Sequence, residues 1–281
     1  MEITVLIENL GPEQLACEHG LAVHIRFRGH SILLDTGSSG AFADNAKVLG
    51  IDLSGVDFAV LSHGHYDHAD GLRAFFAANS TVPMLVRRGA LGPYYSMRGE
   101  TPPRFVGIHR EICRDYAHRL LEVDGLYELT EGAWLVPDPP PEASPERAQH
   151  LYRKIGEDQF TEDDFSHEHS LVLECAEGLV ILNSCCHAGA ANIASHIAAL
   201  FPGKPIAALL GGFHMMGATG TDSINCSADY VRSVADEFKR LNIARIYTGH
   251  CTGQPAFTLL RAHLGDRLRY MKTGSRITLA D

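Results

Sequence analysis

Three observations in the sequence predict an α/β fold. Short apolar segments of strand length recur along the chain, and segments with helical periodicity stand between many of them. A loop dense in histidine follows directly after one apolar strand, and three later apolar strands also end in histidine. Because α/β sheets usually carry their sites at such strand ends, the same pattern predicts both the fold class and the place of a site.

The individual elements follow from periodicity and from turn residues. Strands are expected at 3–7, 21–27, 31–35, 56–61, 82–86, 119–123, 133–136, 170–175, 178–183, 205–210, 244–247 and 275–279. Helices are expected at 41–49, 69–78, 190–200, 227–241 and 257–264. The helix over 227–241 should be amphipathic, since its apolar residues fall on one side: Tyr230, Val231, Val234, Phe238 and Leu241.

With 281 residues, the chain is within reach of a single α/β domain spanning residues 1–281. The pattern weakens over residues 87–165, where a run of prolines begins at Pro137. Such a run cannot lie inside a regular helix or sheet. Two interpretations stay open for this range, surface loops that cover the core and a lid or insertion that shapes a pocket, and we favour a partial lid.

Composition argues against several classes of partner. The net charge is −10 at pH 7, which disfavours binding to nucleic acid or to an anionic membrane, and no apolar run approaches the length of a membrane span. An anionic substrate is not excluded. Seven irregularly spaced cysteines without a Cys-x-x-Cys pair, and an N-terminus without signal-peptide features, predict a reduced, cytoplasmic protein. The expected partner is a small-molecule substrate, and the sequence leaves the oligomeric state open.

The densest chemistry lies in the loop after the strand at 56–61. It contains four metal-binding side chains within six residues: His63, His65, Asp67 and His68. Imidazole nitrogens and carboxylate oxygens suit Zn²⁺ and related divalent ions. His63 and His65 can point the same way, and Asp67 and His68 follow after the turn, so the spacing predicts two metal sites. The alternative is a polar loop that happens to be rich in histidine.

Three later strands end in His187, His214 and His250. A shared sheet edge would gather these histidines near the first loop, so His187 and His250 are expected as metal ligands. His214 is a candidate catalytic residue that could bind substrate, donate a proton or support a ligand. An ordinary hydrogen-bonded histidine at a strand end is the alternative for His214.

The run His63-Gly64-His65-Tyr66-Asp67-His68 resembles the His-x-His-x-Asp-His signature of the metallo-β-lactamase superfamily, and Asp35-Thr36-Gly37 resembles its early turn. The finer pattern is similar to the dihydropterin-ribofuranosylaminobenzene-phosphate synthase-related subfamily. It covers the segments 18–21, 62–72, 186–189, 211–214 and 250–253. The resemblance implies an αββα sandwich. It also implies one metal held by His63, His65 and His187, and a second held by Asp67, His68 and His250.

One part of the superfamily pattern is absent. In the superfamily a bridging carboxylate usually precedes the last histidine of the site. No Asp stands at the strand end before His187 in this sequence. Cys186, Glu168, His169 or a bridging water could replace it. Asp35 is expected to hold a ligand or a loop from behind, as an outer carboxylate does.

These residues predict a metal-dependent hydrolase of a small molecule, with a phosphoester as one candidate. Two divalent ions, Zn²⁺ with Mn²⁺ or Fe²⁺ as alternatives, would activate a hydroxide, and Asp67 would orient it and carry a proton. One alternative is a synthase-type enzyme acting on a pterin precursor, as the subfamily implies. Another is a ligand-binding or regulatory protein with little turnover. A di-iron oxygen or nitric-oxide reductase is less favoured, since no flavodoxin-like segment is present.

Overall fold

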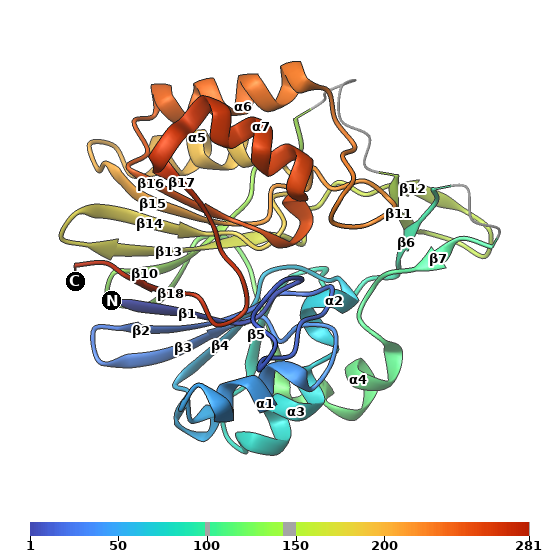
Figure 1. Ribbon diagram of the computed structural model, residues 1–281. Helices are drawn as coiled ribbons and strands as arrows, with labels where there is room; N and C mark the ends of the chain where they lie inside the picture. The colour runs from blue at the N-terminus through green and yellow to red at the C-terminus, as the bar shows by residue number, and fades with distance from the viewer. Residues whose placement is uncertain (99–101, 143–149, 281) are drawn as a thin grey trace. The chain divides into compact units, whose positions relative to one another are not determined.

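The computed structural model describes residues 1–98, 102–142 and 150–280 and divides into two compact units. The first unit comprises Met1–Asp124, His150–Glu168 and Lys272–Leu279. The second comprises Gly125–Gln149, His169–Met271 and Ala280–Asp281. Each unit is built on one seven-stranded mixed sheet with a layer of helices packed against it (Figure 1). Each unit therefore has the sheet and helical layer that half of an αββα sandwich needs.

The sheet of the first unit has the strand order β18 (Arg276–Thr278), β1 (Glu2–Ile7), β2 (Ala22–Phe27), β3 (His30–Leu34), β4 (Phe58–Leu61), β5 (Met84–Arg87) and β8 (Leu120–Val123). Its helices are α1 (Ala41–Val48), α2 (Tyr66–Ala69), α3 (Leu72–Ala78) and α4 (Arg110–Asp115). Phe42 of α1 and Phe75 of α3 share one apolar cluster with Leu33 and Leu61 of the sheet. Since β3 and β4 are parallel, their carboxyl ends lie side by side.

A second, smaller sheet belongs to the first unit. Its antiparallel strands follow the order β12 (Phe160–Glu162), β11 (Leu151–Lys154), β6 (Tyr94–Ser96) and β7 (Arg104–Phe105) (Figure 1). All four strands fall inside the range 87–165, of which residues 99–101 and 143–149 lie outside the described chain. The range is divided between the two units. Its role as a lid stays a prediction, as does the single-domain assignment.

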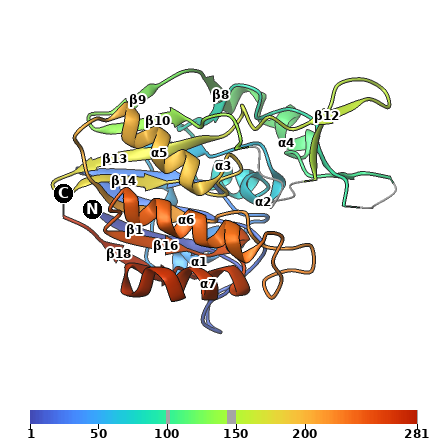
Figure 2. The same ribbon diagram turned by 90° about the horizontal axis from the view of Figure 1, so that it is seen from above.

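The sheet of the second unit has the order β17 (Leu268–Tyr270), β16 (Arg245–Thr248), β15 (Ile206–Gly211), β14 (Gly178–Leu182), β13 (His169–Cys175), β10 (Ala133–Pro137) and β9 (Tyr127–Thr130). The helices α5 (Ala190–Leu200), α6 (Ala228–Arg240) and α7 (Gln254–Leu264) lie next to one another on it (Figure 2). The Ser227 hydroxyl caps α6 by accepting from the Tyr230 amide at 3.0 Å. The predicted amphipathic face is confirmed, because Tyr230, Val231, Val234 and Phe238 are buried.

Every strand predicted from the sequence occurs, with ends shifted by at most two residues. The prediction of one helix over 69–78 is wrong. The amide of Gly71 donates to the Gly37 carbonyl at 3.3 Å, which separates α2 from α3. The strands that sequence reasoning missed have two to four residues and carry little periodicity. Among the described residues, none of the helices combines the length and the apolar character that crossing a bilayer requires.

Candidate metal centre

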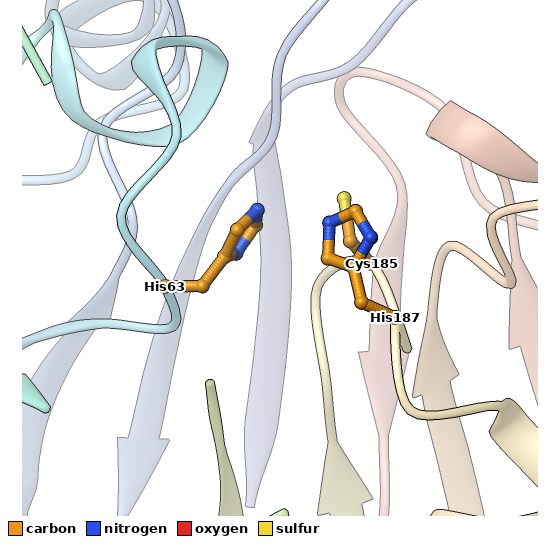
Figure 3. A group of neighbouring side chains, drawn as sticks. All are labelled: His63, Cys185 and His187. Carbon is orange, nitrogen blue, oxygen red and sulfur yellow. The ribbon is translucent and has the colours of Figure 1, made fainter. Parts of the chain in front are cut away.

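The histidine-rich loop follows β4 in the first unit. His63 and His65 lie in the turn after the strand, whereas Asp67 and His68 lie on the short helix α2. Figure 3 shows His63 on this loop. The turn is paired with the chain beyond β7, because His65 forms a bridge with Gly107 and the Tyr66 amide donates to the Val106 carbonyl at 3.0 Å.

Asp35 is the buried anchor of this loop. It follows β3 in the left-handed conformation, with φ of 61°. One carboxylate oxygen accepts the Ser62 amide at 2.7 Å, and the other accepts the Ser62 hydroxyl at 2.8 Å. The second oxygen also lies 2.8 Å from His68 Nδ1. Asp35 therefore holds the loop and a candidate ligand from behind, in the place that the sequence predicts.

These hydrogen bonds determine the tautomers of two histidines. A carboxylate only accepts, so His68 Nδ1 carries the proton that it donates to Asp35. The Ser62 hydroxyl gives its one hydrogen to Asp35, so its contact of 2.8 Å with His63 Nδ1 requires that nitrogen to donate as well. In both rings Nε2 then carries the lone pair, which is the arrangement that a metal ligand needs.

Electrostatics favours the neutral form of these imidazoles. Burial lowers the pKa of His63 well below its usual value, and the neighbouring His68 and His65 lower it further. Burial, with His167 second, lowers the pKa of His65 to about 4. A neutral imidazole can ligate a metal ion at neutral pH, whereas a protonated one cannot.

The N-terminal loop adds one histidine to this group. His19 Nε2 lies 3.2 Å from Asp67 Oδ2. Glu18 points elsewhere, since its carboxylate accepts from the amides of Ser38 and Ser39. His19 therefore contacts a candidate ligand, whereas Glu18 secures the turn after β3.

In the second unit, the candidate ligands lie at the carboxyl ends of parallel strands. His187 follows β14, His214 follows β15 and His250 follows β16. The rings of His187 and His214 are 4.2 Å apart between centroids. Cys185 places its sulfur within 4.8 Å of a ring nitrogen of His187 and of one of His250. Figure 3 shows Cys185 and His187 on the same loop after β14.

Glycine allows these strand ends to approach closely. Gly211 at the end of β15 has φ of 149°, and a Cβ there would lie 1.4 Å from the Asn183 carbonyl oxygen. A Cβ on Gly212 would lie 2.4 Å from Cys251 Sγ. Side chains at these positions would separate the loops that carry the histidines.

The structure favours Cys185 over Cys186 as a candidate thiolate ligand. Cys186 is fully buried in the apolar cluster that includes Ile193 and Phe213. Sequence reasoning named Cys186 and missed Cys185, because two adjacent cysteines offer no signal of which one faces the histidines. The other two candidates lie in separate units, Glu168 in the first and His169 at the start of β13 in the second. All seven cysteines lie in the described part of the chain, and none of them forms a disulfide.

A further pair near the first loop also escaped sequence reasoning. Asp163 and His167 are both buried, and together with His65 they place ligand-type atoms within 4.8 Å of one another. Their spacing in the sequence follows no metal-binding pattern, so no signal could have identified them.

Comparison with known proteins gives consistent matches along the chain. A sequence profile described as the metallo-beta-lactamase superfamily matches residues 16–250. The chain is 26% identical over 264 residues to an uncharacterized protein of Methanocaldococcus jannaschii, covering 92% of this chain and 93% of the relative. It is 23% identical over 278 residues to the 7,8-dihydropterin-6-methyl-4-(beta-D-ribofuranosyl)-aminobenzene-5'-phosphate synthase of that organism, covering 92% and 90% of the two chains. A crystal structure described as a metal-dependent hydrolase of the beta-lactamase superfamily matches with a TM-score of 0.81 and 26% identity, covering 100% of both chains.

Proposed function

Because the chain belongs to the metallo-beta-lactamase superfamily and has its α/β sandwich fold, we propose that it is a hydrolase that uses two divalent metal ions. This family membership confirms the predicted fold class and the resemblance of the His-x-His-x-Asp-His motif. The proposed ligands are His63, His65, Asp67 and His68 of the first unit, with His187 and His250 of the second. Zn²⁺ is the proposed ion, with Mn²⁺ and Fe²⁺ as alternatives.

One observation carries this proposal: the hydrogen-bond network of Asp35. Asp35 accepts the proton of His68 Nδ1 directly, and the Ser62 hydroxyl, which donates to Asp35, accepts that of His63 Nδ1. Imidazoles held in this way by a carboxylate are typical of metal ligands. Both rings are thereby fixed in the tautomer whose Nε2 carries the lone pair that a metal ligand needs. The donor set of imidazole and carboxylate fits a transition metal, and the Cys185 thiol is a further candidate ligand.

When bound, such ions lower the pKa of water towards neutrality and so supply an activated hydroxide. Asp67 adds negative charge beside His68, since its Oδ2 lies 3.7 Å from His68 Nε2. We assign Asp67 a second role, which is to orient the nucleophile and carry a proton to the leaving group. His214 is proposed to contact the substrate or to donate a proton, because its ring packs on that of His187.

The proposed substrate is a small molecule, with a phosphoester as the leading class. The synthase relative bears a phosphate in the name of its product, and it matches over 92% of this chain. A synthase-type reaction on a pterin precursor is the second candidate for the same reason. The net charge of −10 argues against nucleic acid and membrane partners, and cysteines that form no disulfide suit the proposed cytoplasmic location.

A substrate panel tests the proposal. The protein is purified, stripped with a chelator, reloaded with Zn²⁺, Mn²⁺ or Fe²⁺, and assayed on phosphomonoesters, phosphodiesters, lactones and thioesters. We expect hydrolysis that is lost on stripping and restored on reloading. A matched variant pair, His68→Ala and His263→Ala, distinguishes the loss of a site histidine from the loss of a surface histidine, because His263 is exposed. Turnover that survives stripping, or that His68→Ala leaves intact, would contradict a metal hydrolase. Metal binding without turnover would favour a regulatory protein.

A further inference from the structure

The buried pair of Asp163 and His167 lies beside the histidine-rich loop but does not belong to its sequence motif. His167 is fully buried and Asp163 is 6% exposed. His167 Nε2 lies 3.1 Å from Asp163 Oδ2. Burying two ionisable groups is costly unless they are paired and hydrogen-bonded, so the contact needs a structural or functional reason.

The tautomer of His167 follows from its other nitrogen. The backbone amide of Gly64 donates to His167 Nδ1 at 3.1 Å, so Nδ1 carries a lone pair. The proton of the neutral ring is then on Nε2 and is donated to Asp163.

This tautomer argues against His167 as a metal ligand. His65, Asp163 and His167 could hold an ion by distance alone. However, Nδ1 already accepts from Gly64, and Nε2 carries the proton that binds Asp163. A metal at Nε2 would require that proton to move to Nδ1, where it would face the Gly64 N–H. The His167 ring therefore holds the loop through Gly64 and does not bind a metal ion.

The residue that His167 contacts, Gly64, lies in the middle of the His-x-His segment of the motif. Gly64 stands between His63 and His65, and a Cβ on Gly64 would lie 2.0 Å from the Ala90 carbonyl oxygen. The backbone of Gly64 is thus enclosed by Ala90 on one side and hydrogen-bonded to His167 through its amide. A shift of this amide would move the two flanking histidines.

Tyr94 in turn fixes His167. The two rings are 4.0 Å apart with an interplanar angle of 31°, and the Tyr94 hydroxyl donates to the Gly89 carbonyl at 2.7 Å. His167 is therefore held by a tilted neighbouring ring and by a carboxylate, which leaves its ring little freedom to rotate.

We propose that His167, oriented by Asp163, is a positioning residue that holds the Gly64 amide and so sets the geometry of His63 and His65 for metal binding. The inference rests on the proposed metal centre. Outer residues that orient ligands typically contribute roughly 10- to 100-fold to metal affinity. The segment between β12 and β13 would then determine the geometry of the metal ligands without contacting the ion.

Two substitutions of the same residue test the inference. His167→Phe keeps a planar ring but removes the acceptor for Gly64, whereas His167→Asn keeps an acceptor at the position of Nδ1. Zn²⁺ affinity is measured against a chromophoric chelator, and the absorption spectrum of the Co²⁺-loaded protein reports ligand geometry. We expect His167→Phe to weaken Zn²⁺ binding by roughly 10- to 100-fold and to shift the Co²⁺ bands. His167→Asn should retain most of the affinity, and the exposed His263→Ala should match the parent.

Parental affinity and an unchanged Co²⁺ spectrum in His167→Phe would overturn the inference, as would equal losses in both variants. If His167→Phe does not fold, Asp163→Asn decides: a weaker affinity than the parent supports the inference, and parental affinity contradicts it. A parent that binds no metal would overturn the proposed function as well, whereas a metal-binding parent with an unaffected His167→Phe overturns the positioning role alone.

Discussion

The two units hold their candidate ligands in different ways. In the first unit, four candidates lie within six consecutive residues of one loop, and an outer layer of Asp35, Ser62 and His167 orients that loop by hydrogen bonds. In the second unit, Cys185, His187 and His250 are up to 65 residues apart and are brought together by strand topology. The first arrangement depends on a hydrogen-bond network, and the second depends on the packing of strand ends.

This difference predicts different weak points. The first group should fail when a buried polar anchor is removed, because unsatisfied donors are then left in the interior. The second group should fail when a glycine at a strand end acquires a side chain, because the loops cannot approach. Substitutions of each kind therefore separate the two arrangements.

Asp35→Ala should have the largest effect. It removes the acceptor of the Ser62 amide, the Ser62 hydroxyl and His68 Nδ1 at once. Breaking a buried charged network typically costs about 3–5 kcal/mol, so we expect a loss of that order in the free energy of unfolding. Chemical denaturation of the metal-free protein measures it. The control is the exposed Asp44→Ala on α1, for which we expect less than about 1 kcal/mol. Equal effects of the two variants would refute the anchoring role of Asp35.

Asp67→Asn should damage turnover far more than the fold. Asp67 lies on the short helix α2 and not in an apolar strand, so packing depends little on it. Asn keeps the size but loses the charge that favours a metal ion. We expect kcat to fall by roughly 100-fold or more, or about 3 kcal/mol of barrier. Metal content and thermal unfolding are followed in the same sample, with Asp229→Asn on α6 as an exposed control. Near-normal kcat with one ion lost would show that a single metal suffices.

Gly211→Ala tests the second arrangement. The added Cβ would meet the Asn183 carbonyl oxygen at 1.4 Å, and φ of 149° is unfavourable for alanine. We expect a loss of about 2–3 kcal/mol in stability from strain at this position. Gly203→Ala also has positive φ, 81°, but has no atom within 4 Å of the added Cβ, so it isolates the conformational cost at about 1 kcal/mol. Equal losses would mean that the close approach at β15 is unimportant.

Adjacent cysteines give the smallest and most specific test. Cys185→Ser replaces a thiolate candidate near His187 and His250, so Zn²⁺ affinity should fall by roughly 10-fold, or about 1.4 kcal/mol. Cys186→Ser places a hydroxyl in an apolar cluster, so stability should fall by about 1–3 kcal/mol while affinity is kept. Chelator competition and denaturation of both variants measure the two effects. A loss of Zn²⁺ affinity in Cys186→Ser but not in Cys185→Ser would instead identify Cys186 as the ligand.

The same contrast explains what the sequence could reveal. His63 to His68 were predictable because their chemistry is local and needs no knowledge of distant strands. His187, His214 and His250 could be placed at strand ends because apolar runs of β14, β15 and β16 precede them. Asp163 and His167 could not be predicted, since the contact of His167 with Gly64 spans 103 residues and depends on where the chain returns after β12. Nor could the choice of Cys185, which depends on the turn after β14, where Cys186 has φ of 52°.

The metal content of the purified protein tests the central claim most directly. Elemental analysis is carried out after mild dialysis, and again after incubation with Zn²⁺, Mn²⁺ or Fe²⁺ followed by removal of excess metal. With ligands supplied by both groups, we predict close to two divalent ions per chain. A protein that contains no transition metal and takes up none of the three would contradict the account, whatever its fold.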